Sequence, residues 1–277
     1  MKVKTYRILT LIFITLAFSG CIGIEGEGAP HEPSRSTNYD TAEFSIVESP
    51  VKYVSFNGIE IGYKEFGTGE PILMIMPFAT EMDMYNDTFV KQLAGSYRVI
   101  LFDNRGMGYS SDNNESLSIS LLANDTAGLM DALGMDSAHI FGSSMGSVIA
   151  QELALEHAGK VDRLILSSTT YSLDIPQTEN LKRRLQYRAS DPDTEPVLRK
   201  YAQANLKWNG TYERLPEIQN QVLILVANED VLTPPGMSIK MTEQLPDAKI
   251  VRFESAGHLG EQYLPEEYAN EILLFLE

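Results

Sequence analysis

The sequence predicts an α/β fold in which a mostly parallel central sheet is covered by helices on both faces. Short apolar or β-branched runs alternate with longer stretches of helical apolar spacing from about residue 51 to the end of the chain, a pattern typical of that architecture. Several runs are continuously apolar, as expected of strands that are buried on both faces. At 277 residues and 43% hydrophobic, the chain has enough apolar material for one sizeable core.

The first strands are predicted to be antiparallel. Residues 51–56 and 59–66 flank the pair Asn57-Gly58, which supplies the positive φ values that a tight two-residue turn needs. We therefore expect a hairpin at the start of the sheet. Residues 71–76 and 97–102 follow as continuous apolar runs and are expected to be buried strands.

Helices and strands then alternate, except between residues 171 and 220. That segment is polar and charged, contains Lys182-Arg183-Arg184 and has no strand-like run, so a helical insertion that forms a small cap fits it best. The other predicted elements are helices at 85–93, 119–133, 148–157, 237–245 and 266–276, and strands at 138–141, 161–166, 221–226 and 249–253.

The N-terminus has the layout of a secretory signal. A basic stub precedes an almost wholly apolar run at residues 8–20, and such a run is typical of a signal core, whereas a spanning helix needs about 20 apolar residues. Phe18-Ser19-Gly20-Cys21 resembles the lipobox of prokaryotic lipoproteins, with Phe18 in place of the usual Leu. This predicts a signal peptide at residues 1–20 and lipidation of Cys21; an uncleaved N-terminal anchor is the alternative.

The segment after Cys21 is predicted to be a flexible stalk. Residues 22–43 are rich in Gly, Glu, Pro and Ser and show no apolar periodicity, so they cannot bury a core. The expected organisation is a lipidated stalk at 21–43 and a single domain at 44–277 that includes the cap. Because Cys21 is the only cysteine, no intrachain disulfide is possible. Both N-terminal alternatives predict export and attachment to the outer face of a membrane.

The charge balance argues against nucleic acid as a partner. Lys and Arg total 22 against 38 for Asp and Glu, which gives a formal net charge of -16. Such a surface repels phosphates and anionic headgroups.

A candidate nucleophile lies between a predicted strand and a predicted helix. Gly142-Ser143-Ser144-Met145-Gly146 matches G-x-S-x-G, and the strand-turn-helix setting is the context of a nucleophile elbow. The turn forces its central residue into a strained conformation that exposes the side chain. Ser144 occupies that centre, and the following helix points its positive end at the site.

A serine hydroxyl needs a base to remove its proton, and the base is commonly histidine. His31 falls in the predicted stalk, His139 in the strand before the elbow, and His157 near the end of a helix. His258 follows the strand at 249–253 and is therefore expected at the carboxyl edge of the sheet, where open α/β sheets place their sites. We predict that His258 is the base.

The base in turn needs a carboxylate to hold its tautomer. Glu229 and Asp230 both follow the strand at 221–226, and Asp230 is the preferred candidate. Either acid could instead cap the next helix or face solvent. Asp174 is a third candidate after the preceding strand.

The tetrahedral intermediate of acyl transfer needs two backbone amide donors. Met145, just after the nucleophile, is expected to supply one. The other should come from the loop after residue 76, and because Pro77 has no amide hydrogen, Phe78 is the expected donor. Phe78 and Met145 could also simply line the pocket with apolar surface.

From about residue 51 to the end, the chain resembles the α/β-hydrolase superfamily, nearest to its lactonase, methylesterase and cofactor-free haloperoxidase-like branch. Besides the elbow, residues 102–110 (Phe-Asp-Asn-Arg-Gly-Met-Gly-Tyr-Ser) are similar to the D-x-R-G-x-G-x-S loop of that branch. The segments around Asp230 and His258 resemble its acid and histidine motifs. Asp103 and Arg105 are expected to be structural, tying this loop beneath the pocket by charged hydrogen bonds.

The chain departs from the superfamily pattern at several positions. Met76-Pro77 stands where His-Gly is usual, Ser143 replaces a common His, and Ser147 replaces a common Gly. The resemblance nevertheless implies a serine hydrolase that cleaves a carboxylic ester or lactone, acts on a small-molecule acyl substrate and requires no cofactor or metal. A serine nucleophile argues against dehalogenase or epoxide hydrolase activity, because those relatives attack through a carboxylate.

Three alternatives to this function remain open. The same triad could act on an amide, a thioester or a carbon-carbon bond, or catalyse perhydrolysis. The fold also hosts non-catalytic binding proteins, and a surface lipoprotein could use its cap as an adhesive or scaffolding surface. The complete set of Ser144, Asp230 and His258 favours the enzyme.

Overall fold

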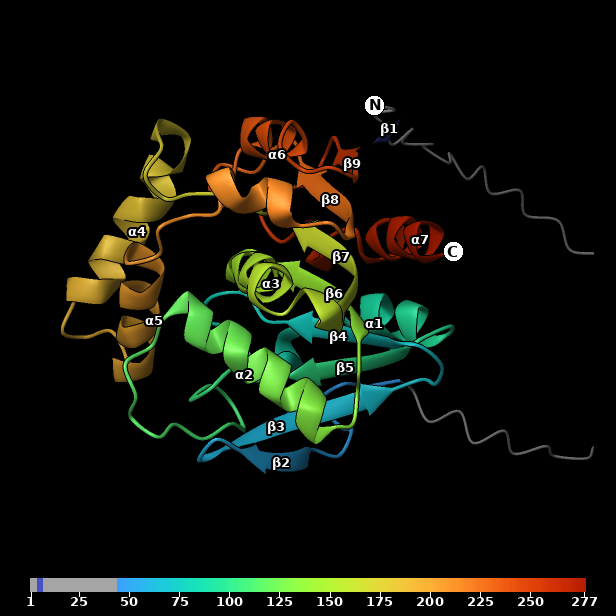
Figure 1. Cartoon of the computed structure of the whole chain (residues 1–277), viewed down its shortest axis with the longest axis vertical. Coiled ribbons are helices and arrows are strands. Elements are labelled where there is room, and N and C mark those ends of the chain that lie inside the picture. The colour runs from blue at the N-terminus through green and yellow to red at the C-terminus, as the bar shows by residue number, and fades with distance from the viewer. Residues whose placement is uncertain (1–3, 7–43) are drawn as a thin grey trace, which may run out of the picture.

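The computed structural model describes residues 4–6 and 44–277 and contains a nine-stranded sheet with the order β1-β9-β8-β7-β6-β4-β5-β3-β2. Neighbouring strands are parallel from β1 to β5, whereas β3 and β2 run antiparallel to their neighbours. Helices cover both faces (Figure 1). The predicted fold class is therefore confirmed.

The predicted hairpin forms the antiparallel edge of the sheet. β2 (Lys52–Phe56) pairs with β3 (Ile59–Phe66), and Asn57 and Gly58 between them have φ values of 48° and 75°. This is the positive-φ pair that the turn requires. β3 then pairs with β5 (Arg98–Phe102).

The central strands separate two apolar layers. Alternate residues of β4 (Pro71–Ile75) face opposite sides: Leu73 and Ile75 pack into one buried cluster, and Ile72 and Met74 pack into the other. This follows from the two-residue period of a strand. The other central strands are β6 (Ala138–Ser143), β7 (Val161–Ser167), β8 (Gln221–Ala227) and β9 (Ala248–Phe253).

The helices divide between these two layers. α2 (Ile119–Ala132), α3 (Met145–Glu156) and α6 (Pro235–Thr242) contribute to the cluster that contains Leu73. α1 (Asp87–Ala94) and α7 (Pro265–Leu276) contribute to the opposite one and pack against each other. Short 3-10 turns occur at Met82–Met84, Ala158–Lys160 and Gly260–Gln262.

Helix α1 begins two residues later than the sequence predicts. The Asn86 side chain accepts hydrogen bonds from the amides of Thr88 and Phe89 and so caps the helix. Such a cap satisfies amides that have no partner inside the helix, and it fixes where the helix begins.

The segment after β7 is helical, and its two longer helices lie side by side at one end of the molecule (Figure 1). α4 (Glu179–Ser190) packs against α5 (Pro196–Leu206), and 3-10 turns at Pro176–Thr178 and Tyr212–Glu217 flank the pair. The Trp208 indole donates to the Glu152 carboxylate of α3 at 2.8 Å. This bond ties the cap to the body of the domain.

Little of the N-terminal segment lies within the described residues. β1 (Lys4–Tyr6) pairs in parallel with β9 at the sheet edge. The rest of the predicted signal peptide, Cys21 and the predicted stalk fall outside residues 4–6 and 44–277. Within those residues, no helix combines the length and the apolar character needed to cross a membrane.

Candidate active site

Ser144 occupies a strained turn between β6 and α3. Its backbone has φ 52° and ψ −118°, a region that non-glycine residues rarely adopt. The Ser144 amide donates to the Ser167 carbonyl of β7 at 3.0 Å, so the neighbouring strand holds the strained residue in place. The predicted elbow geometry is present.

Two glycines allow the strand and the helix to approach this closely. A Cβ on Gly142 would lie 2.3 Å from the Gly146 carbonyl oxygen, and one on Gly146 would lie 2.1 Å from the Ile75 carbonyl oxygen. Both neighbours are backbone atoms, which cannot rotate away as a side chain can. The two glycines of G-x-S-x-G therefore have a packing reason that is independent of chemistry.

The three predicted side chains meet in one hydrogen-bonded chain. The Ser144 hydroxyl lies 2.8 Å from His258 Nε2, and His258 Nδ1 lies 2.8 Å from Asp230 Oδ2. Because a carboxylate only accepts, Nδ1 donates to Asp230 and leaves the Nε2 lone pair facing the serine hydroxyl. This is the arrangement in which imidazole can take the proton of a nucleophile.

Asp230 is held rigidly by its own loop. Its Oδ1 accepts from the amides of Leu232 and Thr233 at 2.8 and 2.9 Å, and its Oδ2 accepts from the Thr233 hydroxyl at 2.6 Å. The residue is 4% exposed. Burial acts to raise the pKa of Asp230, but the hydrogen bond and charge of His258 together with the Thr233 bonds outweigh it and hold that pKa below its usual value.

The other candidate acids lie away from this chain of hydrogen bonds. Glu229 is exposed. Asp174 is also exposed and pairs with Lys182 of the cap at 2.6 Å. Of the three acids that follow β7 and β8, the structure therefore brings only Asp230 to His258.

The other described histidines have contacts elsewhere. His139 Nε2 lies 3.4 Å from a carboxylate oxygen of Glu70, and His157 Nε2 lies 2.7 Å from the Asn124 side-chain oxygen. His31 falls outside the described residues.

The two predicted oxyanion donors flank the nucleophile. Phe78 follows β4, Met145 opens α3, and both line one pocket with Ser144 and His258. Among the loop and cap hydrogen bonds of the described residues, neither amide donates to another backbone carbonyl. The Met145 amide belongs to the first turn of a helix, where amides have no intrahelical acceptor. Both donors are thus free to face a developing oxyanion.

Glu261 is a residue of the site that the sequence did not reveal. It lies 0% exposed behind the elbow, where its carboxylate accepts from the Ser143 hydroxyl at 2.5 Å and from the Ser167 hydroxyl at 3.0 Å. Burial raises the pKa of Glu261, although these two hydrogen bonds act in the opposite direction. The Ser167 carbonyl also accepts from the Ser144 amide. Glu261 therefore stabilises the backbone around the nucleophile through Ser167.

Strained backbone marks this end of the sheet. Besides Ser144, the non-glycine residues Ala79, Ser168 and Leu259 have φ values of 58°, 49° and 59°. Ala79 and Leu259 line the same pocket as Ser144, and the Leu259 amide donates to the Ser168 hydroxyl at 3.2 Å. Such strain persists where the surroundings impose it, and it clusters at functional sites.

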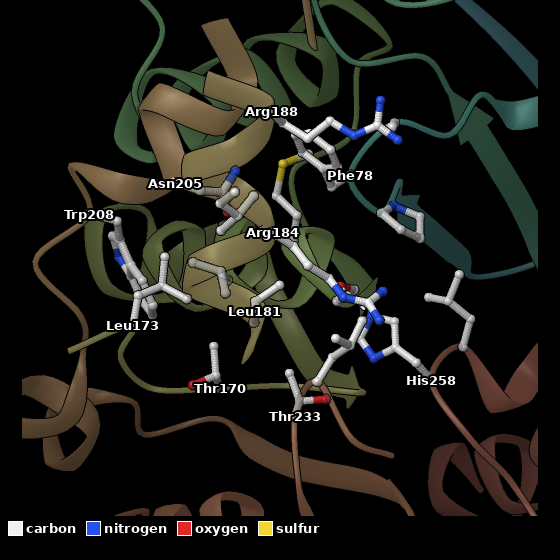
Figure 2. A pocket seen from close by; sticks show the side chains of 18 residues that line it. Phe78, Thr170, Leu173, Leu181, Arg184, Arg188, Asn205, Trp208, Thr233 and His258 are labelled. Carbon is white, nitrogen blue, oxygen red and sulfur yellow. Dashed lines mark hydrogen bonds between the residues drawn. The ribbon is translucent and has the colours of Figure 1, made fainter. Parts of the chain in front are cut away.

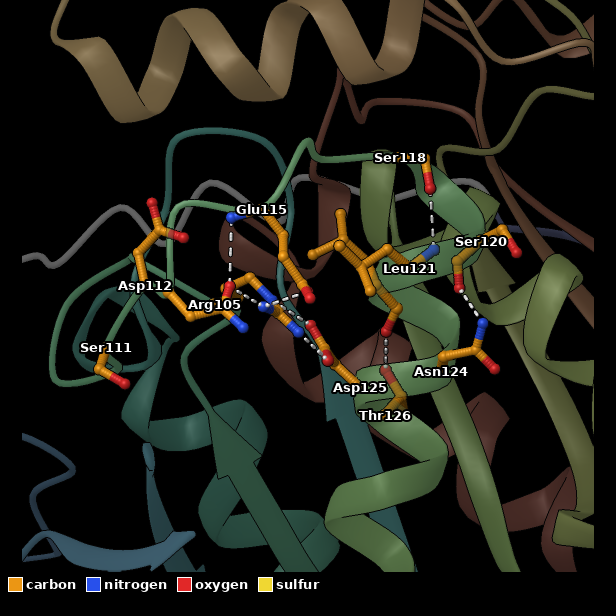
Figure 3. Close-up of polar contacts among 12 residues, drawn as sticks. Arg105, Ser111, Asp112, Glu115, Ser118, Ser120, Leu121, Asn124, Asp125 and Thr126 are labelled. Atoms are coloured by element: carbon orange, nitrogen blue, oxygen red, sulfur yellow. Dashed lines mark hydrogen bonds and ion pairs between the residues drawn. The ribbon is translucent and has the colours of Figure 1, made fainter. Parts of the chain in front are cut away.

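The loop after β5 is structural, as predicted. Arg105 makes a two-pronged contact with Asp125 of α2 at 2.7 and 2.6 Å and also reaches Glu115 at 3.1 Å (Figure 3). The Tyr201 hydroxyl of α5 donates to the Arg105 carbonyl at 2.8 Å. The loop thereby joins α2 to the cap.

Asp103 is buried beside this loop. Its carboxylate accepts from the Met82 amide at 2.7 Å and from the Tyr109 amide at 2.9 Å. Burial raises the pKa of Asp103 to about 6, despite these two hydrogen bonds. Neither Asp103 nor Arg105 lines the pocket of Ser144.

The pocket over Ser144 holds about 250 Å³ and lies between the body and the cap (Figure 2). Apolar side chains predominate in its wall, among them Val148, Leu181 and Leu185, with Trp208 at the far end from His258. A concave, mostly apolar pocket with a few polar groups is typical of small-molecule sites. Within the described residues, no group of three or more His, Cys, Asp or Glu could hold a metal ion.

Comparisons with known proteins agree with this geometry. Residues 70–195 match a family model described as alpha/beta hydrolase fold. This chain has the α/β-hydrolase fold. Sequence relatives support its place in that superfamily.

Curated proteins that are similar to this chain include several hydrolases. The putative non-heme bromoperoxidase BpoC of Mycobacterium tuberculosis is 27% identical over 78% of this chain and 97% of its own length. The putative carbamate hydrolase RutD of Azorhizobium caulinodans is 26% identical over 80% of this chain and 96% of its own length. Among solved structures, an esterase from Thermogutta terrifontis, described as malate bound, has a TM-score of 0.72 and 24% identity. The alignment covers 82% of this chain and 98% of the esterase chain.

Proposed function

We propose that this α/β-hydrolase is a serine hydrolase that cleaves a carboxylic ester or lactone through an acyl-enzyme. The observation that carries the proposal is the unbroken hydrogen-bonded chain from Ser144 through His258 to Asp230, with Ser144 on a strained elbow. Hydrolase and esterase relatives support the reaction class.

Each group has a defined role in the proposed reaction. The Ser144 hydroxyl oxygen attacks the acyl carbon while His258 Nε2 takes its proton, and the amides of Phe78 and Met145 bind the oxyanion. The oxyanion collapses, the acyl–oxygen bond to the leaving group breaks, and His258 returns the proton to the departing alkoxide. Water then attacks the acyl-enzyme by the same route and releases the acid and free Ser144. Asp230 fixes the His258 tautomer and stabilises the imidazolium that forms twice in each cycle.

Labelling with a fluorophosphonate tests the nucleophile directly. The full chain should be labelled, labelling should disappear in Ser144→Ala, and mass spectrometry should place the adduct on Ser144. Ser190→Ala is the control, because the Ser190 hydroxyl is exposed at the end of α4 and bonds only to carbonyls of its own helix. This control is expected to keep the label.

Two results would contradict the proposal. Labelling that persists in Ser144→Ala would exclude this residue as the nucleophile. A wild-type protein that is folded by circular dichroism yet takes up no label would favour a non-catalytic binding protein. If the label is present, hydrolysis of ester and lactone panels against amides and thioesters decides which bond is cleaved.

We also propose that the chain is exported and held at the outer face of a membrane through lipidated Cys21. The support is the basic stub, the short apolar run and the position of the only cysteine. The membrane-extracted protein should lack residues 1–20 and carry the added mass of a lipid, and Cys21→Ser should abolish that processing. An unprocessed mass would contradict lipidation and support the uncleaved anchor. Processing would also remove β1 and leave β9 as the edge strand.

A further inference from the structure

The arginines of α4 differ from the other arginines that the structure describes. Arg183, Arg184 and Arg188 make no hydrogen bond or ion pair within residues 4–6 and 44–277. The other six described arginines all have a partner: Arg98 with Glu65, Arg105 with Asp125, Arg163 with the Phe275 carbonyl, Arg199 with the Thr194 carbonyl, Arg214 with Glu152, and Arg252 with Asn228.

Two of these unpaired arginines line the pocket of Ser144. Arg184 and Arg188 are four residues apart, so they lie on the same face of α4, and both belong to the pocket wall. Arg183 does not line this pocket; it lies in an open groove along α4 that Arg184 and Arg188 also line. Arg184 and Arg188 therefore border both the pocket and this groove, whereas Arg183 borders the groove alone.

The charge of the pocket is opposite to that of the protein. The chain carries a formal net charge of -16, yet the wall of the pocket contains no Asp or Glu and two guanidinium groups. Asp174, which precedes α4, pairs with Lys182 of that helix and not with either arginine. Both arginines are exposed, so water hydrates them in the free protein, and no group of the described chain competes with an anionic ligand for them.

The direction of the side chains points to the reacting centre. Figure 2 shows the Arg184 side chain extending from α4 toward His258, while Arg188 lies at the Phe78 side of the pocket. The apolar end with Leu173 and Trp208 lies away from His258. An anionic group held by these arginines would thus lie near the scissile bond, and an apolar part would fill the remaining space.

We propose that Arg184 and Arg188 form an anion subsite, and that the substrate is an ester or lactone that carries a carboxylate beside an apolar portion. A guanidinium presents paired donors that match a carboxylate, and such charge-assisted bonds are stronger than neutral ones. This inference rests on the proposed function, because it names the substrate class of the same site. Binding of the α4 arginines to anionic lipid headgroups would use Arg183 as well, so the test includes that residue.

Matched ester pairs measure the preference. Mono-4-nitrophenyl adipate and 4-nitrophenyl hexanoate differ by a terminal carboxylate on the acyl part. 4-Acetoxybenzoate and 4-acetoxybenzamide differ by a carboxylate on the leaving group. The full chain is expected to favour the anionic member of at least one pair by about tenfold in kcat/KM, in keeping with one charge-assisted contact.

Variants on α4 assign the preference to residues. Arg184→Gln and Arg188→Gln should each lower kcat/KM for the preferred anionic ester by about tenfold, and change the neutral partner by less than about twofold. Arg183→Gln is the matched control, since it removes the same charge from the same helix outside the pocket. It should leave both esters unchanged. Arg184→Lys should retain part of the preference, because lysine keeps the positive charge but lacks the paired donors of a guanidinium.

The outcomes separate this inference from the proposed function. Equal kcat/KM for both members of both pairs, in a protein that fluorophosphonate labels at Ser144, overturns the subsite and leaves the serine hydrolase intact. An equal loss in Arg183→Gln and Arg184→Gln also overturns it, because the arginines would then act as a general surface field. Absence of labelling and of all ester turnover overturns the proposed function itself.

Discussion

Replacing Gly146 with alanine tests whether the contact between α3 and β4 positions the oxyanion donors. The added Cβ would lie 2.1 Å from the Ile75 carbonyl oxygen, 2.8 Å from the Ile75 carbonyl carbon and 2.9 Å from the Met76 carbonyl oxygen. All three are backbone atoms at the end of β4. Since Cβ atoms essentially never approach closer than 3.0 Å, α3 and β4 must separate.

The separation can be converted into expected magnitudes. The separation amounts to about 1 Å. Because Met145 lies on one side of the gap and Phe78 on the other, the two oxyanion donors move apart. A displacement of this size typically lowers the rate by about 100-fold. Overpacking of this kind costs about 1–3 kcal/mol of stability. For a domain of this size we therefore expect Tm to fall by about 2–12 °C.

The assay compares Gly146→Ala with Gly236→Ala in kcat/KM for a 4-nitrophenyl ester and in Tm. Gly236 also lies in the first turn of a helix, α6, but nothing lies within 4 Å of its added Cβ. Gly236→Ala should keep wild-type kcat/KM and gain up to about 1 kcal/mol, because alanine is the better helix former. Wild-type kcat/KM in a destabilised Gly146→Ala would refute the link between this contact and the oxyanion donors. Wild-type Tm would refute the tight packing itself.

Three further predictions concern charge and chain length. Asp230→Asn should lower kcat by about 10³–10⁴-fold by disturbing the His258 tautomer, whereas Asp174→Asn should not change it; comparable steady-state rates in the two variants would exclude Asp230 as the orienting acid. The folded-state pKa of Asp103 is raised from 3.8 to about 6, so the folded chain holds this proton more tightly than the unfolded chain, and stability falls as pH rises from about 4 to about 6. In urea titrations between pH 4 and pH 7, the free energy of unfolding should therefore fall by about 2–3 kcal/mol more for wild type than for Asp103→Asn. Parallel plots of this free energy against pH for the two proteins would contradict the prediction. Deletion of residues 1–43 should change Tm by less than about 3 °C and preserve fluorophosphonate labelling, because β1 adds only one short edge pairing; loss of folding would show that β1 is essential.

The parts of the fold that could be predicted are those fixed by local chemistry or by chain order. Asn57-Gly58 specifies its turn through two positive φ values, and a continuous apolar run such as β4 can only be buried between two layers. The site followed from the same logic. Parallel strands end at one edge of the sheet, so residues that follow β6, β8 and β9 meet there however far apart they lie in the sequence.

The rest depends on contacts between segments that no local pattern specifies. Glu261 was not recognised because a glutamate three residues after His258 looks solvent-exposed until the Ser143 and Ser167 hydroxyls are placed against it. The charge of Arg184 could be predicted from the sequence, but the direction of its side chain could not. That direction depends on how α4 packs on α5, and helical spacing alone does not set the packing of a cap.

A network of buried hydrogen bonds beneath the pocket connects the backbone of the nucleophile to the cap. The Ser147 hydroxyl donates to the Ser144 carbonyl at 2.6 Å and accepts from the Thr169 hydroxyl at 2.8 Å, and the Gln151 side-chain amide donates to the Thr169 oxygen at 3.0 Å. Thr211 of the cap segment donates to the Gln151 side-chain oxygen at 2.5 Å. These buried groups satisfy one another, so moving the end of the cap would leave polar atoms unpaired near the elbow.

Helix α4 stands outside that network. Of its side chains, only Leu185 is fully buried, and its three arginines have no partner within the described residues. Substitutions on its exposed face are therefore expected to cost little stability. The proposed reacting groups lie at the ends of the strands with buried groups behind them, whereas the proposed anion subsite lies on a helix whose arginines are exposed. Changes in substrate preference should thus map to the pocket face of α4, at Arg184 and Arg188, and leave the labelling of Ser144 intact.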